Sequence, residues 1–237
     1  MYTSKMTVEE IKREYNNDLG YLLEASDREF IRNKKFFLKE ALSKQKKCKS
    51  FIFFVKRYKC PKSKNIYFTT YSYNSNRGFL THYSGVFTDD NEKRLLISVE
   101  KSIDTKGNID DYLIVYTSHL LSRYRERLLN NSDISFDDLV KIFLSNEREG
   151  RELSHVSNEL IRKSKPNEES FTLKTPNGCC FGTRSGSVIV FRTFITDDML
   201  KESQSNTLNS IEEEIKTSID VKQLENILLQ VKERQKI

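Results

Sequence analysis

The chain has 237 residues, of which 37% are hydrophobic and 31% charged, and its formal net charge is +6. This length allows one large domain or one domain with appendages, and the apolar content excludes a wholly disordered chain. No run approaches the roughly 20 apolar residues of a membrane span, and the start of the chain lacks the apolar core of a secretory signal. We therefore expect a cytoplasmic protein without a membrane partner.

The positive charge is unevenly distributed along the chain. Residues 1–50 hold 12 Lys and Arg against 8 Asp and Glu, a net charge of +4. Residues 197–237 hold 6 Lys and Arg against 9 Asp and Glu, a net charge of −3. A basic body with an acidic tail is compatible with nucleic-acid contact, although many soluble proteins share it.

The cysteines do not form a recognisable motif. They are Cys48, Cys60, Cys179 and Cys180. Because no two of them are spaced as C-x2-C, the pattern favours neither a zinc site nor a disulfide framework. No metal and no cofactor are expected.

Residues 1–49 are predicted to form N-terminal helices. Apolar residues recur at helical spacing from about position 7 to 47, and Thr7 precedes Glu10 at the spacing of a capping box. Gly20 and the "EASDRE" stretch predict a break into two helices, with Ser26 or Asp27 as the N-cap of the second.

Residues 50–112 are predicted to form an antiparallel meander. Four runs, "SFIFFVKRY", "NIYFTTYSY", "GFLTHYSGVF" and "RLLISVEKSI", are rich in β-branched and aromatic residues and are separated by turn-forming stretches. The interleaved aromatic and basic residues could stack nucleic-acid bases, but alternating aromatics are more typical of a sheet core. A fifth run, "YLIVY", leads directly into a helix.

Residues 113–200 are predicted to contain that strand, two helices and a three-stranded antiparallel sheet near 170–196. The second helix has Ser135 as its N-cap, and the charged stretch between Asn146 and Ser170 is expected to be a mobile connection with one short helix. Turns at "PNG" and "RSG" separate the last three strands. Residues 201–237 follow as a C-terminal helical tail.

Segregated helices and strands indicate an α+β fold with antiparallel sheets. Its expected parts are an N-terminal helical segment, a central strand–helix–helix unit followed by a three-stranded antiparallel sheet, and a helical C-terminus. The segments could be separate or parts of one compact unit, and the spacing of the strands leaves open whether they form one sheet or two.

The segment "YTSHLLSRYRERLL" carries the side chains with the clearest chemistry. On an α-helix, its candidate catalytic residues share one face, and they are His119, Arg123, Glu126 and Arg127. A histidine imidazole transfers protons near neutral pH, and guanidinium groups bind phosphate bidentately. Glu126 would orient an arginine or act as a weak base. The alternative is an ordinary solvated face whose Arg and Glu side chains pair with one another.

The same segment carries a resemblance to a known family. A strand ending in "YTSH", a helix with "H-x3-R-x2-E-R" and a second helix opening "ISFDDL" are similar to toxin-like domains of the barnase–EndoU–colicin–RelE (BECR) fold group. The later stretches "FTLKTPNGCCFG" and "SVIVFRTFIT" resemble the paired strands of that group. The resemblance covers about residues 113–200.

This resemblance implies functional residues and a reaction. The basic helix positions of the group correspond to His119, Arg123 and Arg127. Its terminal strand corresponds to the substrate-binding candidates Arg192, Thr193 and Thr196. Ribonucleases of the group cleave RNA without a metal, so none is implied. This chain departs from the group in its added N-terminal segment and in an insertion between the helices and the last strands, which leaves room for another role on the same scaffold.

Two functions follow from these observations. The first is a metal-independent ribonuclease or ribonuclease-like toxin that cleaves RNA phosphodiesters through a His/Arg face and has an antitoxin or another protein as partner. The second is a non-catalytic binding or inhibitory protein from a mobile element, a phage or a plasmid. It would use the same basic face to bind a protein or a nucleic acid.

Overall fold

The computed structural model describes residues 2, 6–44, 48, 50–75, 77–89, 91–103, 109–147, 151–154 and 169–200. Its elements in chain order are α1 (Val8–Arg32), α2 (Lys34–Lys44), β1 (Ser50–Lys59), β2 (Ile66–Asn74), β3 (Gly78–Thr88), β4 (Arg94–Ile103), β5 (Ile109–Tyr116), α3 (Ser118–Tyr124), the π-helix η1 (Arg125–Leu129), α4 (Phe136–Glu147), β6 (Arg151–Ser154), β7 (Glu169–Thr175), β8 (Gly178–Ser185), β9 (Val188–Thr196) and the 3-10 turn η2 (Asp197–Met199). The helical tail predicted at 201–237 lies outside the described residues.

All of these strands join one sheet, and the predicted α+β class is confirmed. The nine strands are ordered β1-β2-β3-β4-β5-β9-β8-β7-β6. The strands β1–β4 form the predicted meander, β5 extends it by one antiparallel strand, and β6–β9 form a second antiparallel meander. A parallel pair joins the two, with Leu113 of β5 opposite Val188 of β9. The prediction of purely antiparallel sheets is wrong for this pair, which is parallel.

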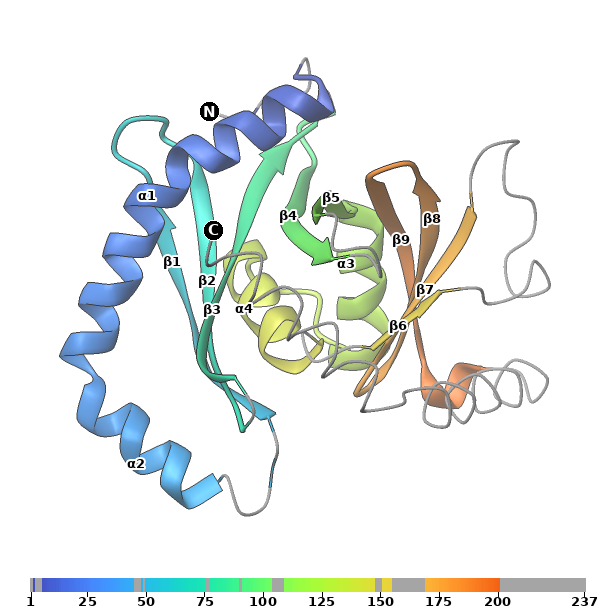
Figure 1. Cartoon of the computed structure of the whole chain (residues 1–237). Helices are drawn as coiled ribbons and strands as arrows, with labels where there is room; N and C mark the ends of the chain where they lie inside the picture. The colour runs from blue at the N-terminus through green and yellow to red at the C-terminus, as the bar shows by residue number, and fades with distance from the viewer. Residues whose placement is uncertain are drawn as a thin grey trace.

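The sheet curves around the central helices. Figure 1 shows β1–β3 on one side of α4 and the strands β7–β9 on the other side of α3. The long helix α1 and its continuation α2 cover the outer face of β1–β3. In the described part of the chain, no helix combines the length and the apolar character that crossing a bilayer requires.

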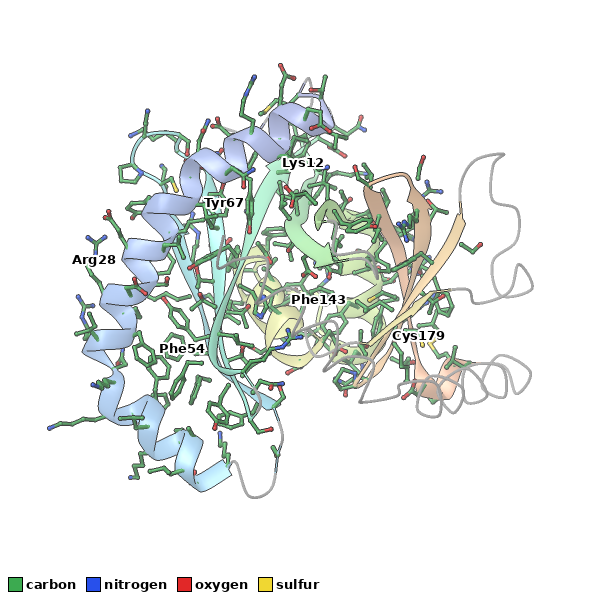
Figure 2. All side chains as sticks on the ribbon, viewed as in Figure 1. Lys12, Arg28, Phe54, Tyr67, Phe143 and Cys179 are labelled. Carbon is green, nitrogen blue, oxygen red and sulfur yellow. The ribbon has the colours of Figure 1, made fainter. Side chains whose placement is uncertain are left out.

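Side-chain alternation along the strands divides the apolar residues between two cores, because successive residues point to opposite faces. The inner core lies on the face of the sheet that packs against α3 and α4, and it contains Leu96 of β4 and Phe143 of α4. The outer core lies on the face covered by α1, and it contains Ile97, the neighbour of Leu96, and Tyr67 of β2. Figure 2 shows Phe143 between strands β1–β3 and strands β7–β9, and Tyr67 on the side of the sheet covered by α1. Apolar burial therefore holds helices to both faces of the sheet.

The break predicted near "EASDRE" is wrong. α1 continues through this stretch, so Ser26 and Asp27 lie inside the helix and neither is an N-cap. Ser26 instead forms a hydrogen bond of 2.8 Å to the hydroxyl of Tyr83 on β3. Contact with the sheet stabilises the helix where the local sequence favours a cap, as tertiary packing commonly does. The capping box of Thr7 and Glu10 is confirmed.

The second meander contains one strand more than predicted. Residues Arg151–Ser154, in the stretch expected to be a mobile connection, form β6 and pair with β7. The three strands predicted near 170–196 are confirmed as β7, β8 and β9. Ser135 begins α4 as predicted, because its hydroxyl accepts a hydrogen bond from the amide of Asp138 at 3.2 Å.

Aromatic side chains around β1 pack between the sheet and the α1–α2 pair. Phe37 of α2 is 1% exposed, and its ring centroid lies 4.7 Å from that of Phe53 and 5.6 Å from that of Phe54. Figure 2 shows Phe54 on the side of β1 that faces these helices. These aromatics contribute to a core, and Phe37 is too buried to stack on nucleic-acid bases.

Candidate functional site

The segment with the predicted catalytic residues begins at a junction tied to β9. Thr117 is the N-cap of α3, and its hydroxyl accepts a hydrogen bond from the amide of Leu120 at 3.2 Å. The Thr117 amide donates to the carbonyl of Phe191 at 3.1 Å, and the hydroxyl donates to the carbonyl of Arg192 at 3.4 Å. These bonds fix the start of α3 against the strand.

A β-bulge in β9 shapes the same junction. The pairing of β8 with β9 shifts between Phe181 and Gly182, which leaves Arg192 as the extra residue on β9. Because of this extra residue, Phe191 and Phe194 both reach the inner core although they are three positions apart. The Arg192 side chain is exposed beside the start of α3.

The three predicted substrate-binding residues of β9 differ in accessibility. Arg192 is exposed and Thr193 is half-buried, whereas Thr196 is only 5% exposed. A hydroxyl as buried as that of Thr196 does not reach a substrate at the surface. Of the three, Arg192 is the side chain best placed to contact a large ligand.

Three of the four predicted catalytic residues follow one side of α3 and the start of η1. His119 is exposed, and its imidazole forms no hydrogen bond to the described residues. Arg123 donates from Nη1 to Oε2 of Glu126 at 2.9 Å, and the hydroxyl of Ser122 donates to Oε1 of Glu126 at 3.3 Å. Such an exposed pair one helical turn apart contributes about 0.2–0.5 kcal/mol. The charge of Arg123 is therefore largely compensated by Glu126.

Arg127 belongs to a different environment. Residues Arg125–Leu129 form the π-helix η1, whose wider turns hold more residues than those of an α-helix. The half-buried Arg127 donates from Nη1 to the carbonyl oxygen of Phe194 on β9. Its guanidinium therefore holds the helix against the sheet and does not lie free beside His119.

The adjacent side of the same helix lines a cleft of about 250 Å³, called here the α3 cleft. Its polar lining consists of Lys93, Arg94, Ser118, Ser122 and Arg125. On the helix, the two serines and the arginine stand one position before His119, Arg123 and Glu126. The residues predicted as catalytic therefore lie on the same helix as the cleft lining, on the neighbouring stripe. No signal in the sequence distinguishes this stripe, because Arg127, like Arg125, has no carboxylate three or four positions away.

Arg125 is incompletely satisfied within the α3 cleft. Its Nη1 donates to the carbonyl of Ser132 at 3.4 Å, a long distance, and its Nε is buried without a hydrogen-bond partner. A buried donor without an acceptor is unfavourable by about 1–3 kcal/mol. Among the described residues, neither Arg125 nor Lys93 pairs with a carboxylate. An anion in the cleft would supply the missing acceptor.

Arg94 is fixed at the edge of the cleft. Its guanidinium carbon lies 4.6 Å from the ring centroid of Phe136, a cation–π distance. The nearby carboxylate of Asp137 accepts from Nε of Arg57 at 2.9 Å and lies 4.0 Å from Arg94. Because Asp137 is engaged chiefly by Arg57, the lining of the cleft remains positive.

The buried thiols provide no nucleophile. Cys179 and Cys180 are 0% exposed, and burial raises the pKa of the Cys180 thiol well above its usual range. Burial likewise raises the pKa of Cys60 to about 12. Thiolate, the reactive form, is therefore scarce at neutral pH. Within the described ranges, no three His, Cys, Asp or Glu side chains are grouped closely enough to hold a metal ion.

Comparison with known proteins yields no relative. No protein-family model matches the chain. Neither a curated protein nor a solved structure matches it. What the site does is therefore inferred from its own residues.

Proposed function

We propose that the chain is an RNA-binding protein that holds backbone phosphates in the α3 cleft. The observation that carries this proposal is Arg125, whose buried Nε has no acceptor and whose charge has no carboxylate partner among the described residues. Guanidinium and ammonium groups bind phosphate oxygens strongly, and hydroxyls such as those of Ser118 and Ser122 add further hydrogen bonds. The relationship to the BECR fold group remains a separate proposal.

The charge of the body supports a polyanion as the ligand. Residues 1–196 hold 34 Lys and Arg against 25 Asp and Glu, a net charge of +9. Sequence-independent affinity for nucleic acids comes mainly from such positive charge, because each phosphate contact releases a bound counterion. Lys93, Arg94 and Arg125 line the cleft, and the one carboxylate near Arg94, that of Asp137, is paired with Arg57. Two of the cations that line the cleft are guanidinium forks, which bind phosphate oxygens bidentately.

Replacing Arg125 with glutamine should weaken binding of labelled single-stranded RNA about tenfold or more. The substitution removes one charge-assisted hydrogen-bonding group, whose loss is worth about 1.5–3 kcal/mol. The slope of log K against log salt concentration should also decrease by about one phosphate contact. Fluorescence anisotropy over a range of salt concentrations measures both quantities.

A matched control for this test is Lys62→Gln. Lys62 is exposed in the turn between β1 and β2 and does not line the cleft, yet its substitution changes the net charge by the same amount. Equal loss of affinity in the two variants would mean that binding follows net charge alone, and the α3 cleft would not be the site. An absence of RNA binding by the unmodified protein would remove the proposal altogether.

A ribonuclease is the second candidate function, and the position of His119 favours it. The imidazole is exposed, is not held by any described residue, and follows Ser118, which lines the cleft. A phosphate in the cleft would place a neighbouring ribose near the only exposed histidine of α3. In this mechanism His119 would accept the proton of the ribose 2′-hydroxyl as its oxygen attacks the phosphorus and return a proton to the 5′-oxygen as the P–O5′ bond breaks. Arg125, with Arg123 and Arg192, would stabilise the phosphate charge.

Replacing His119 with alanine distinguishes the two functions. If the protein cleaves RNA, the variant should lose cleavage while keeping its RNA affinity and a Tm within about 1–2 °C, because an exposed substitution changes stability by less than roughly 0.5 kcal/mol. Gel analysis of end-labelled RNA measures the cleavage. Intact RNA after incubation with the unmodified protein would leave binding as the function.

A further inference from the structure

A second polar cavity shares no lining residue with the α3 cleft. Its volume is about 840 Å³, within the roughly 300–1,000 Å³ typical of small-molecule sites. It is bordered by the first turns of α1, the beginning of β5 and the turn between β8 and β9. Its lining includes Lys12, Arg13, Asp111, Tyr112, Arg184 and Ser187. We call it the α1 cavity.

The parallel pair β5–β9 creates this cavity. The amide of Leu113 donates to the carbonyl of Ser187 at 2.8 Å, so the β8–β9 turn lies beside the start of β5. Lys12 of α1 connects to both, because its Nζ donates to the carbonyl of Asp111 at 2.9 Å and to Oγ of Ser187 at 3.0 Å. Figure 2 shows Lys12 where α1 passes over the sheet. Residues from both ends of the described chain thus meet at one site.

Three cations are available in the cavity, and two of them are held in place. The Lys12 side chain is only 12% exposed, and two of the three ammonium N–H donors are used by the bonds above. The nearest carboxylate, that of Glu9, is 3.9 Å away and 82% exposed. Arg13 and Arg184 form no ion pair with a carboxylate of the described residues. The cavity therefore has positive charge that is free to bind an anion.

Arg184 provides a flat, oriented surface. Its Nη2 donates to the hydroxyl of Tyr112 at 2.8 Å, and its Nε donates to the carbonyl of Gly186 at 3.3 Å. The guanidinium carbon lies 4.8 Å from the ring centroid of Tyr112. A guanidinium fixed in this way exposes a plane on which a nucleic-acid base can stack.

Asp111 supplies a buried acceptor that no described residue satisfies. Its Oδ1 is shielded from solvent and has no hydrogen-bond partner in the part of the chain that the structure describes. Buried polar atoms are bonded in the large majority of cases, and an exception at a cavity wall points to a ligand group that donates. Hydroxyl and amino groups are such donors, whereas inorganic phosphate offers mainly acceptors near neutral pH.

We propose that the α1 cavity binds a nucleoside phosphate, either free or as the phosphorylated end of an RNA strand. The phosphate contacts Arg13 and the remaining donor of Lys12. A ribose hydroxyl donates to Oδ1 of Asp111, and the base stacks on the open plane of Arg184. This pairing of an anion site with a buried acceptor and a stacking surface selects a nucleotide over phosphate alone.

Calorimetric titration of the full chain with AMP and with inorganic phosphate tests the proposal. AMP should bind more tightly than phosphate, and Arg184→Gln should weaken AMP binding about tenfold, as expected for losing a charge-assisted contact and a stacking plane. Asp111→Ala should weaken AMP binding and leave phosphate binding equal or stronger, because the variant loses an acceptor for the ribose and a negative charge. A thermal melt of each variant verifies that it is folded.

Controls separate this site from the α3 cleft and identify the source of the nucleotide. Lys62→Gln should leave AMP affinity unchanged, and Arg125→Gln should weaken RNA binding without removing the preference for AMP over inorganic phosphate. A short RNA with a 5′-phosphate that binds more tightly than AMP, and loses this advantage in Arg184→Gln, would identify an RNA end as the ligand. Absence of binding by both AMP and this RNA at up to about 10 mM, an affinity below that of typical sites, would overturn the proposal. Equal weakening of AMP and phosphate by Asp111→Ala would also overturn it.

Discussion

Replacing Gly182 with alanine should lower the free energy of unfolding by about 3–5 kcal/mol, a large fraction of the total stability of a typical domain. A Cβ at this position would lie 2.0 Å from the carbonyl oxygen of Val190 and 2.8 Å from Cα of Phe191. Both atoms belong to the backbone of the paired strand, so no side-chain rotation relieves the overlap. The bulge at Arg192 would have to open, which would displace Phe191 and Phe194 from the inner core and release the start of α3.

Chemical denaturation followed by circular dichroism measures this effect, and Gly20→Ala is its matched control. Gly20 lies inside α1, and a Cβ there would meet no atom within 4 Å. Alanine is favoured over glycine in a helix by about 0.5–1 kcal/mol, so the control should be slightly more stable than the unmodified protein. Similar stability of Gly182→Ala and the unmodified protein would show that the two strands are not held as closely as described.

Replacing Asp18 with alanine should destabilise the protein by about 3–4 kcal/mol and lower its Tm by roughly 6–16 °C. Asp18 is 6% exposed on the inner side of α1. Its Oδ2 accepts from the Ser63 hydroxyl at 2.8 Å, the Asn65 amide at 2.7 Å and the Tyr67 hydroxyl at 2.9 Å. Removing the carboxylate leaves these donors buried without their acceptor, which is more costly than losing one exposed ion pair.

A second pair of variants tests the physical reason for this loss. Asp27→Ala removes an exposed carboxylate from the same helix and should change stability by less than about 0.5 kcal/mol. In a double-mutant cycle, Asp18→Ala and Tyr67→Phe should couple by about 0.5–3 kcal/mol, because their groups are in direct contact. Additive effects of the two substitutions would contradict the role given to this hydrogen bond.

The sequence predicted which segment holds the candidate site, but not which side of its helix lines the cleft. The "YTSHLLSRYRERLL" pattern identified the helix, and an α-helical projection placed Arg127 beside His119 and Arg123. The π-turn η1 and the carbonyl of Phe194 direct Arg127 elsewhere. Which stripe of a helix lines a cleft depends on the elements packed around it, and these come from distant parts of the chain. The stripe of Ser118, Ser122 and Arg125 could therefore not be distinguished by sequence.

The α1 cavity shows the same limit more strongly. Lys12 and Ser187 are separated by 175 positions, and neither lies in a motif that suggests the other. Only the parallel pairing of β5 with β9 and the passage of α1 over the sheet bring them within 3.0 Å.

By itself, the sequence determined the type and approximate position of most described elements. The capping box of Thr7 and Glu10, the cap of Ser135 and the turns between the last three strands act through contacts a few residues apart, so local patterns suffice to predict them. Only the tertiary structure decided that nine strands form one sheet, that α1 continues past Ser26, and that β6 is a strand. These outcomes depend on the burial of apolar side chains and on strand pairing between distant segments, which override weak local preferences because they contribute more free energy.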